Sequence, residues 1–144
     1  MTALSPLDRL VALEDLRRMQ ARLYRLASAR DWRAVQDLFT PDGQFRVFRA
    51  DGTLECFADG RGIGETIERV VGEGIFVVRG YGEEIEILSD SRAEINCSVE
   101  DLLFAGQTRR VLHGFGSLSL AYRRAEGTWR VRSAEFTRIA RERR

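Results

Sequence analysis

The sequence predicts one α+β domain, in which three helices from the N-terminal half pack on a strongly curved, mainly antiparallel sheet. The first part of the chain carries apolar side chains at helical spacing, whereas the chain after residue 75 reads as β-rich segments separated by turn pairs. A chain of 144 residues that is 44% apolar can bury one core and a small pocket, but two domains would each lack core. We therefore expect a single domain over residues 1–144, with an ordered core from about 5 to 139 and a disordered tail from Ala140 to Arg144.

The first helix is predicted to begin after Ser5, whose hydroxyl can cap it, with Pro6 at the first helical position and Asp8 in the first turn. Arginines occupy one side of this helix. The other side keeps the i, i+3, i+4, i+7 spacing of a buried face, with Leu13, Leu16, Gln20, Leu23, Tyr24 and Ala27. Tyr24 is therefore expected to point towards the core.

A second, short helix over residues 32–39 is predicted to follow a break at Asp31, and Thr40–Pro41 would stop it. The β-rich runs between Phe45 and Phe57 flank Asp51–Gly52, a turn pair that adopts positive φ easily. This pattern predicts the first hairpin.

A third helix is expected over residues 65–71, with Gly72 as its C-terminal stop. The remaining chain predicts a meander of long strands at 75–88, 92–104, 108–124 and 128–139. In the third of these, Gly114 and Gly116 share a face with the leucines and with Tyr122, which indicates that the strand bends sharply.

Composition excludes several chemistries. All 23 basic residues are arginine, so Schiff-base lysines, pyridoxal attachment and the P-loop lysine are ruled out. The net charge of +1 gives no reason to expect nucleic acid or an anionic membrane as a partner. One histidine, His113, and two separated cysteines, Cys56 and Cys97, cannot supply a closed zinc site or a redox pair. We expect no metal and no cofactor.

The N-terminal residues form neither a basic nor an apolar signal segment, and no stretch approaches the roughly 18 apolar residues that span a bilayer. We therefore expect a cytoplasmic protein with free thiols. The pairs Arg109–Arg110 and Arg123–Arg124 can mark a subunit face or solvated strand edges, and a homodimer or homotrimer is the expected assembly.

Three features carry a family resemblance: the order helix, helix, hairpin, short helix and long meander; the segments 30–32 and 38–43; and the run Gly-Thr-Trp-Arg-Val at 127–131. Together they resemble the nuclear-transport-factor-2-like superfamily and, within it, the SnoaL-like group, over nearly the whole chain. The resemblance implies a cone in which the bent sheet wraps the first helix. Its open end would hold an apolar pocket suited to a small hydrophobic or aromatic ligand.

The resemblance also implies a site. In dehydratase-like members, an aspartate after the first helix works with a tyrosine from that helix and a histidine from the strand after the third helix. Asp31 and Tyr24 match the first two, whereas the histidine position falls on Gly80. The chain is then a non-catalytic binder, uses another base, or brings His113 into the pocket through a bulge beside Gly114.

Each candidate also has a purely structural interpretation. Asp31 can simply cap the second helix, and Tyr24 can be a core tyrosine whose hydroxyl bonds the backbone. His113 alternates with the leucine face of its strand, which favours a surface or interface position. As catalytic groups, a carboxylate withdrawn from water would act as general base, and a phenol would donate to a developing oxyanion.

Five further residues are assigned to substrate binding, partly because their strand positions share a face with apolar neighbours: Tyr81, Cys97, Asp101, Trp129 and Glu135. Asp101 and Glu135 can instead form surface ion pairs. The predicted function is a cofactor-independent lyase or isomerase that acts on a small aromatic or alicyclic substrate. The alternative is a small-molecule-binding or protein-interaction module of the same fold.

Overall fold

The computed structural model describes residues 4–106 and 110–144 and contains, in chain order, the following elements. They are α1 (Pro6–Ser28), α2 (Trp32–Asp37), β1 (Phe39–Phe48), β2 (Leu54–Asp59), the 3₁₀ turn η1 (Gly60–Gly62), α3 (Ile63–Val71), β3 (Ile75–Ile87), β4 (Arg92–Ala105), β5 (Arg110–Ala125) and β6 (Thr128–Arg143). The order confirms the predicted succession of helices and strands.

The first helix begins as its sequence predicts. Ser5 Oγ accepts a hydrogen bond from the Asp8 backbone N–H at 3.1 Å, and Pro6 occupies the first helical position. The face predicted to be apolar is the face that packs on the sheet, because Leu16 and Gln20 are fully buried. The helix ends before Arg30, whose positive φ of 58° turns the chain into α2.

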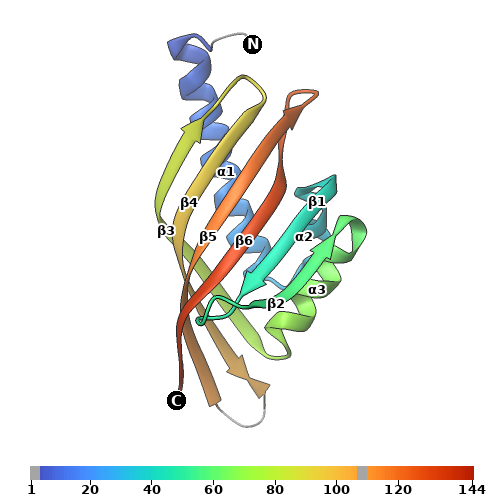
Figure 1. Cartoon of the computed structure of the whole chain (residues 1–144), viewed down its shortest axis with the longest axis vertical. Coiled ribbons are helices and arrows are strands. Elements are labelled where there is room, and N and C mark those ends of the chain that lie inside the picture. The colour runs from blue at the N-terminus through green and yellow to red at the C-terminus, as the bar shows by residue number, and fades with distance from the viewer. Residues whose placement is uncertain (1–3, 107–109) are drawn as a thin grey trace.

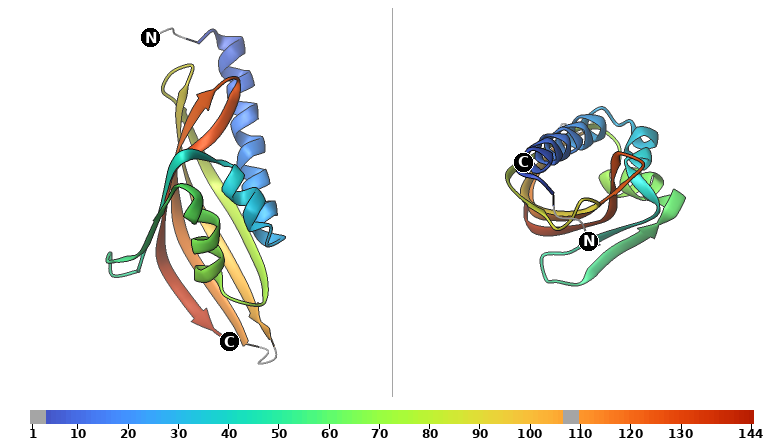
Figure 2. Two further views of the ribbon diagram at one scale, coloured as in Figure 1. Left: turned by 90° about the vertical axis from the view of Figure 1, so that its right-hand side faces the viewer. Right: turned by 90° about the horizontal axis from the view of Figure 1, so that it is seen from above.

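The sheet has the strand order β2-β1-β6-β5-β4-β3, and all neighbours are antiparallel except β1 and β6. The long strands β3 to β6 run beside α1, while α2 and α3 lie near β1 and β2 (Figure 1). Seen from above, the sheet curves so that its concave face turns towards α1 (Figure 2). These features confirm an α+β cone fold.

A side chain of β6 explains why Gly116 of β5, on the concave face, has none of its own. A Cβ at Gly116 would collide with the ring of Phe136 on the neighbouring strand. Leu118, Leu120 and Tyr122 follow on the same face and are buried, so the predicted alternation of this strand is confirmed.

The predicted boundaries differ from the structure at several places, of which the end of the second helix and the C-terminus matter most. The second helix ends at Asp37 rather than at residue 39, because Phe39 already pairs with Val131 as part of β1. The C-terminal residues are not a disordered tail, since β6 continues to Arg143 along β5 and the Arg144 N–H donates to the Val111 carbonyl at 2.9 Å. Thr108 and Arg109, which the sequence assigned to the strand before β6, lie outside the described residues.

Two β-bulges in β6 change which of its side chains lie on the concave face of the sheet. Val131 pairs with Tyr122 but Ser133 pairs with Ala121, so Arg132 is an extra residue. Further along, Ile139 is extra in the same way. The concave face of β6 therefore carries Trp129, Val131, Ala134, Phe136, Arg138 and Arg141, a set that no strict alternation would give.

Candidate functional site

An apolar cavity of about 370 Å³ lies between α1, α3 and the concave face of the sheet. Phenylalanine and aliphatic side chains dominate its wall, among them Phe39, Phe45, Ile67, Phe76, Val99 and Leu118. Six side chains add polar atoms: Tyr24, Arg49, Glu55, Asp101, Arg138 and Arg141. An apolar cavity with a few polar groups is the usual form of a small-molecule site.

Tyr24 brings a hydroxyl from α1 to the cavity wall. Its Oη accepts a hydrogen bond from Gln20 Nε2 at 3.0 Å and contacts Cys97 Sγ on β4 at 3.1 Å. Burial raises the pKa of the Tyr24 phenol, and the contact with Cys97 raises it further. The phenol is therefore neutral at physiological pH and acts as a hydrogen-bond donor rather than as a base.

A buried amide fixes the direction of this hydroxyl. Gln20 is fully buried, and its Oε1 accepts a short hydrogen bond from the Tyr122 hydroxyl on β5. Because the Gln20 amide uses its oxygen for Tyr122, its NH₂ group faces Tyr24. The proton of Tyr24 is then directed to Cys97 or to a ligand in the cavity.

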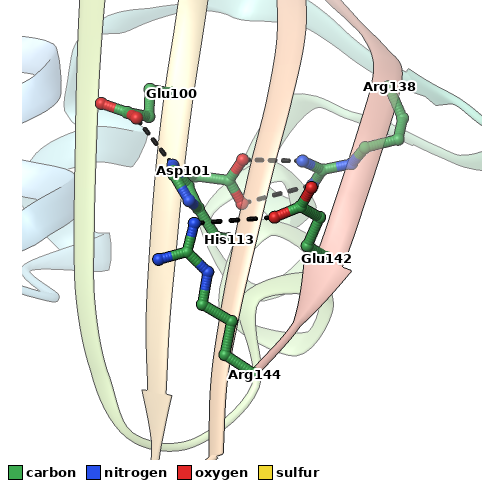
Figure 3. Close-up of polar contacts among 6 residues, drawn as sticks. All are labelled: Glu100, Asp101, His113, Arg138, Glu142 and Arg144. Carbon is green, nitrogen blue, oxygen red and sulfur yellow. Dashed lines mark hydrogen bonds and ion pairs between the residues drawn. The ribbon is translucent and has the colours of Figure 1, made fainter.

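A buried ion pair forms a second polar point on the wall. Asp101 on β4 is 6% exposed, and both of its carboxylate oxygens accept hydrogen bonds from the Arg138 guanidinium, at 2.7 and 3.3 Å (Figure 3). The pair crosses β5 at Gly114, where a Cβ would collide with both side chains. Glycine at position 114 thus makes room for an ion pair between two strands that are not neighbours.

Asp31 lies apart from this cavity. Its side chain is exposed, and Oδ1 accepts a hydrogen bond from the Ala34 N–H at 3.2 Å as the N-cap of α2. It is not among the residues that line the cavity. The geometry therefore gives Asp31 the capping role that the sequence offered as its structural interpretation.

His113 faces the opposite side of the sheet from the cavity. Its Nε2 lies 2.6 Å from Glu100 Oε2, and its ring packs against Phe115 at a centroid distance of 4.7 Å. Figure 3 shows this pair beside, but not part of, the Asp101–Arg138 pair. The bulge that would turn His113 inward is absent, because residues 110–115 of β5 pair regularly with β4.

The residues predicted to bind substrate separate into three groups. Asp101 lines the cavity, and Cys97 reaches it only through its contact with Tyr24. Trp129 is buried on the concave face but does not line the cavity. Tyr81 and Glu135 are exposed and lie outside it; for Glu135, the extra residue in β6 reverses the predicted facing.

Glu83 is a polar residue of the concave face that sequence reasoning missed. A register shift between Tyr81 and Glu84 in β3, with Gly82 at a φ of 63°, turns Glu83 inward. Burial raises the pKa of Glu83, although the charge of Arg17 opposes the shift. Its carboxylate also raises the pKa of Tyr24, so the two groups interact. The only signal in the sequence was the glycine of a bulge.

Within residues 4–106 and 110–144, no cluster of three or more His, Cys, Asp or Glu side chains is arranged to hold a metal ion. In the same residues, no helix is long and apolar enough to cross a membrane. The polar chemistry of the cavity wall comes from the phenol, the carboxylates and the guanidinium groups described above.

Comparison with known proteins matches a family model, the SnoaL-like domain, over residues 8–135. A solved structure of a hexachlorocyclohexane dehydrochlorinase, LinA type 2, is 13% identical and superposes with a TM-score of 0.84 over 97% of this chain and 93% of that one. A candidate scytalone dehydratase from Novosphingobium aromaticivorans is 17% identical, with a TM-score of 0.81 over 94% and 89% of the two chains.

An NTF2-like protein with a cystatin-like fold from Novosphingobium aromaticivorans is 22% identical, with a TM-score of 0.72 over 91% of this chain and 86% of that one. At such identities, the structural matches establish the fold alone. A comparison of the sequence with curated proteins gives no match.

Proposed function

The chain belongs to the family of SnoaL-like domains, and from this membership and its cavity we propose that it is a cofactor-independent lyase or isomerase. The substrate would be a small hydrophobic molecule, aromatic or alicyclic, held in the apolar cavity. Structural neighbours described as a dehydrochlorinase and a candidate dehydratase support an elimination as the reaction class.

One observation carries the proposal: Tyr24 presents a neutral, directed phenol to a cavity that is otherwise mainly apolar. Gln20 occupies an acceptor position of the hydroxyl, so the Tyr24 proton can pass to a substrate oxygen or to a leaving group. In a water-poor cavity such a donor stabilises developing negative charge more strongly than it would in water.

Asp101 is the proposed base, because its carboxylate is buried in the cavity wall and Arg138 holds it in a fixed position. On β4, Asp101 lies four residues from Cys97, the Tyr24 contact, or about 13 Å of strand. The two groups would therefore act at different ends of the substrate. Such a separation requires a substrate in which the charge left on the deprotonated carbon is delocalised, through conjugated double bonds, to the oxygen held by Tyr24.

The proposed reaction begins with the removal of a proton from carbon. A carboxylate oxygen of Asp101 takes a proton from carbon, and the C–H electron pair becomes a new C=C bond. In an elimination, the bond to the leaving group breaks with its electron pair. Tyr24 protonates a leaving hydroxide, whereas chloride leaves as the anion with a hydrogen bond from Tyr24. In an isomerisation, Tyr24 stabilises the enolate oxygen and the proton returns at another carbon. Exchange with water then restores both side chains.

The test uses Tyr24→Phe and Asp101→Asn against Tyr81→Phe and Glu135→Gln, matched changes at exposed positions outside the cavity. Each protein would be incubated in D₂O with a panel of hydroxylated and chlorinated cyclohexanes and cyclohexenones. NMR would measure deuterium uptake, and mass spectrometry the loss of water or HCl.

The expected rates fall by about 10²–10³ for Tyr24→Phe and about 10²–10⁴ for Asp101→Asn, while both controls keep the wild-type rate. Thermal unfolding midpoints would distinguish a variant that has lost catalysis from one that no longer folds. Turnover that survives both substitutions would overturn the assignment.

A binding module is the second candidate, and a specific observation favours it. Both oxygens of Asp101 already accept hydrogen bonds from Arg138, so the carboxylate is less available as a base. This function predicts saturable binding of the same compounds with no deuterium uptake and no product.

A further inference from the structure

A bulge in β6 places two guanidinium groups on the same face of the sheet. Arg138 pairs with Gly116 and Arg141 pairs with Gly114, and both partners belong to the concave face of β5. In a regular strand, residues three apart point to opposite faces. The extra residue Ile139 changes this alternation, and both arginines line the cavity.

The two arginines differ in what they already bind. Arg138 is committed to both oxygens of Asp101. Arg141 forms no hydrogen bond or ion pair with any side chain in the described part of the chain, so its five N–H donors are available. Because Arg141 lines the cavity and is also exposed, its guanidinium lies at the boundary between cavity and solvent.

The charges around Arg141 leave its own charge incompletely compensated. Partial burial lowers the pKa of Arg141, and the like charges of Arg138 and Arg143 lower it further, whereas Asp101 and Glu55 oppose the shift. The two carboxylates therefore do not fully offset the cost of holding this guanidinium beside another. An anion bound at Arg141 would relieve the repulsion.

We infer that Arg141 forms an anion subsite, which binds the carboxylate of a small aromatic or alicyclic acid whose apolar body fills the cavity. The inference rests on the proposed hydrophobic substrate class and adds an acidic group to it. A guanidinium fork matches a carboxylate with two parallel N–H···O bonds, which fixes the orientation of the ligand as well as adding affinity. The apolar body would then extend from Arg141 past Asp101 towards Tyr24.

The experiment compares two probes of the same shape, 2-naphthoate and the neutral 2-naphthamide, by isothermal titration calorimetry. Wild-type protein should bind the acid at least about tenfold more tightly than the amide. Arg141→Gln should reduce this preference to near unity, and Arg141→Lys should retain part of it. Arg130→Gln is the matched control, because Arg130 is exposed on the same strand and does not line the cavity.

Competition between the probes would establish that they share one site. The subsite would be overturned if wild-type protein bound both probes equally well or bound neither. It would also be overturned if Arg141→Gln kept the preference for the acid, or if Arg130→Gln reduced that preference as much as Arg141→Gln does. Since the readout is binding without turnover, the subsite can stand where the lyase or isomerase proposal fails. Conversely, turnover of neutral substrates by Arg141→Gln would leave the chemistry standing without the subsite.

Discussion

The hydroxyl of Tyr24 occupies the space that a side chain at position 80 would need. A Cβ built on Gly80 would collide with Tyr24 Oη and with the ring carbons beside it. By the family resemblance, the histidine position falls on Gly80, and the space beside this glycine is filled by the phenol of Tyr24. The absence of a side chain at position 80 is therefore matched by the position of Tyr24.

This relationship predicts a coupled effect of substitutions at positions 80 and 24. Gly80→Ala should lower the free energy of unfolding by about 1–3 kcal/mol, because the new methyl group overpacks the site and displaces Tyr24. The same change in a Tyr24→Ala background should cost much less, since the collision is gone. Urea denaturation of the four proteins in this cycle measures the coupling.

Gly62→Ala is the control for glycine replacement, because a Cβ there meets nothing within 4 Å and its φ is negative. Equal costs of Gly80→Ala in the presence and absence of Tyr24 would contradict the steric relationship.

Asp31 can be tested for capping and catalysis separately. Asparagine caps helices as well as aspartate does, so Asp31→Asn should leave both stability and turnover near the wild-type values. Asp31→Ala should cost about 0.5–2 kcal/mol of stability while retaining turnover at a temperature where the protein is folded. Thermal unfolding and the D₂O assay measure the two effects. A loss of turnover in a stable Asp31→Asn protein would restore the catalytic assignment made from the sequence.

Glu83 predicts a pH dependence of stability. Its pKa is raised in the folded state, so the folded protein binds this proton more tightly than the unfolded chain does. The free-energy cost of holding an ionised Glu83 in the folded protein is absent below the ordinary pKa of glutamate. This cost grows as pH rises through the raised pKa. Glu83→Gln should therefore stabilise the protein at neutral pH, and the gain should vanish on acidification.

Thermal midpoints from pH 4 to 8 would measure this effect, with Glu84→Gln as the exposed neighbouring control. A constant difference between wild type and Glu83→Gln across this range would contradict the partly buried position of the carboxylate.

The first helix, α1, and β5 could be predicted because each keeps one period throughout. Gln20 and Tyr24 follow the helical spacing of α1, and Leu118 and Tyr122 follow the two-residue alternation of β5. Hydrophobic patterning reports such regular segments directly.

The cavity chemistry could not be predicted in the same way, since it depends on bulges and on contacts between distant strands. Nothing in the residue types of Arg132 and Ile139 marks them as extra residues. Yet the bulge at Arg132 turns Glu135 outward and Arg138 inward, and the bulge at Ile139 returns the alternation so that Arg141 faces inward as well. Likewise, the Asp101–Arg138 pair joins strands that are two apart in the sheet. Only the register of β4, β5 and β6 brings these groups together.

Three glycines on the concave face leave space for side chains from other elements. Gly80, Gly114 and Gly116 receive, respectively, the phenol of Tyr24, the Asp101–Arg138 pair and the ring of Phe136. A related scaffold that acquired only the tyrosine, the aspartate and the arginine would have no volume in which to place them. Transplanting this cavity into another cone-shaped protein therefore requires the transfer of its glycines together with its polar residues.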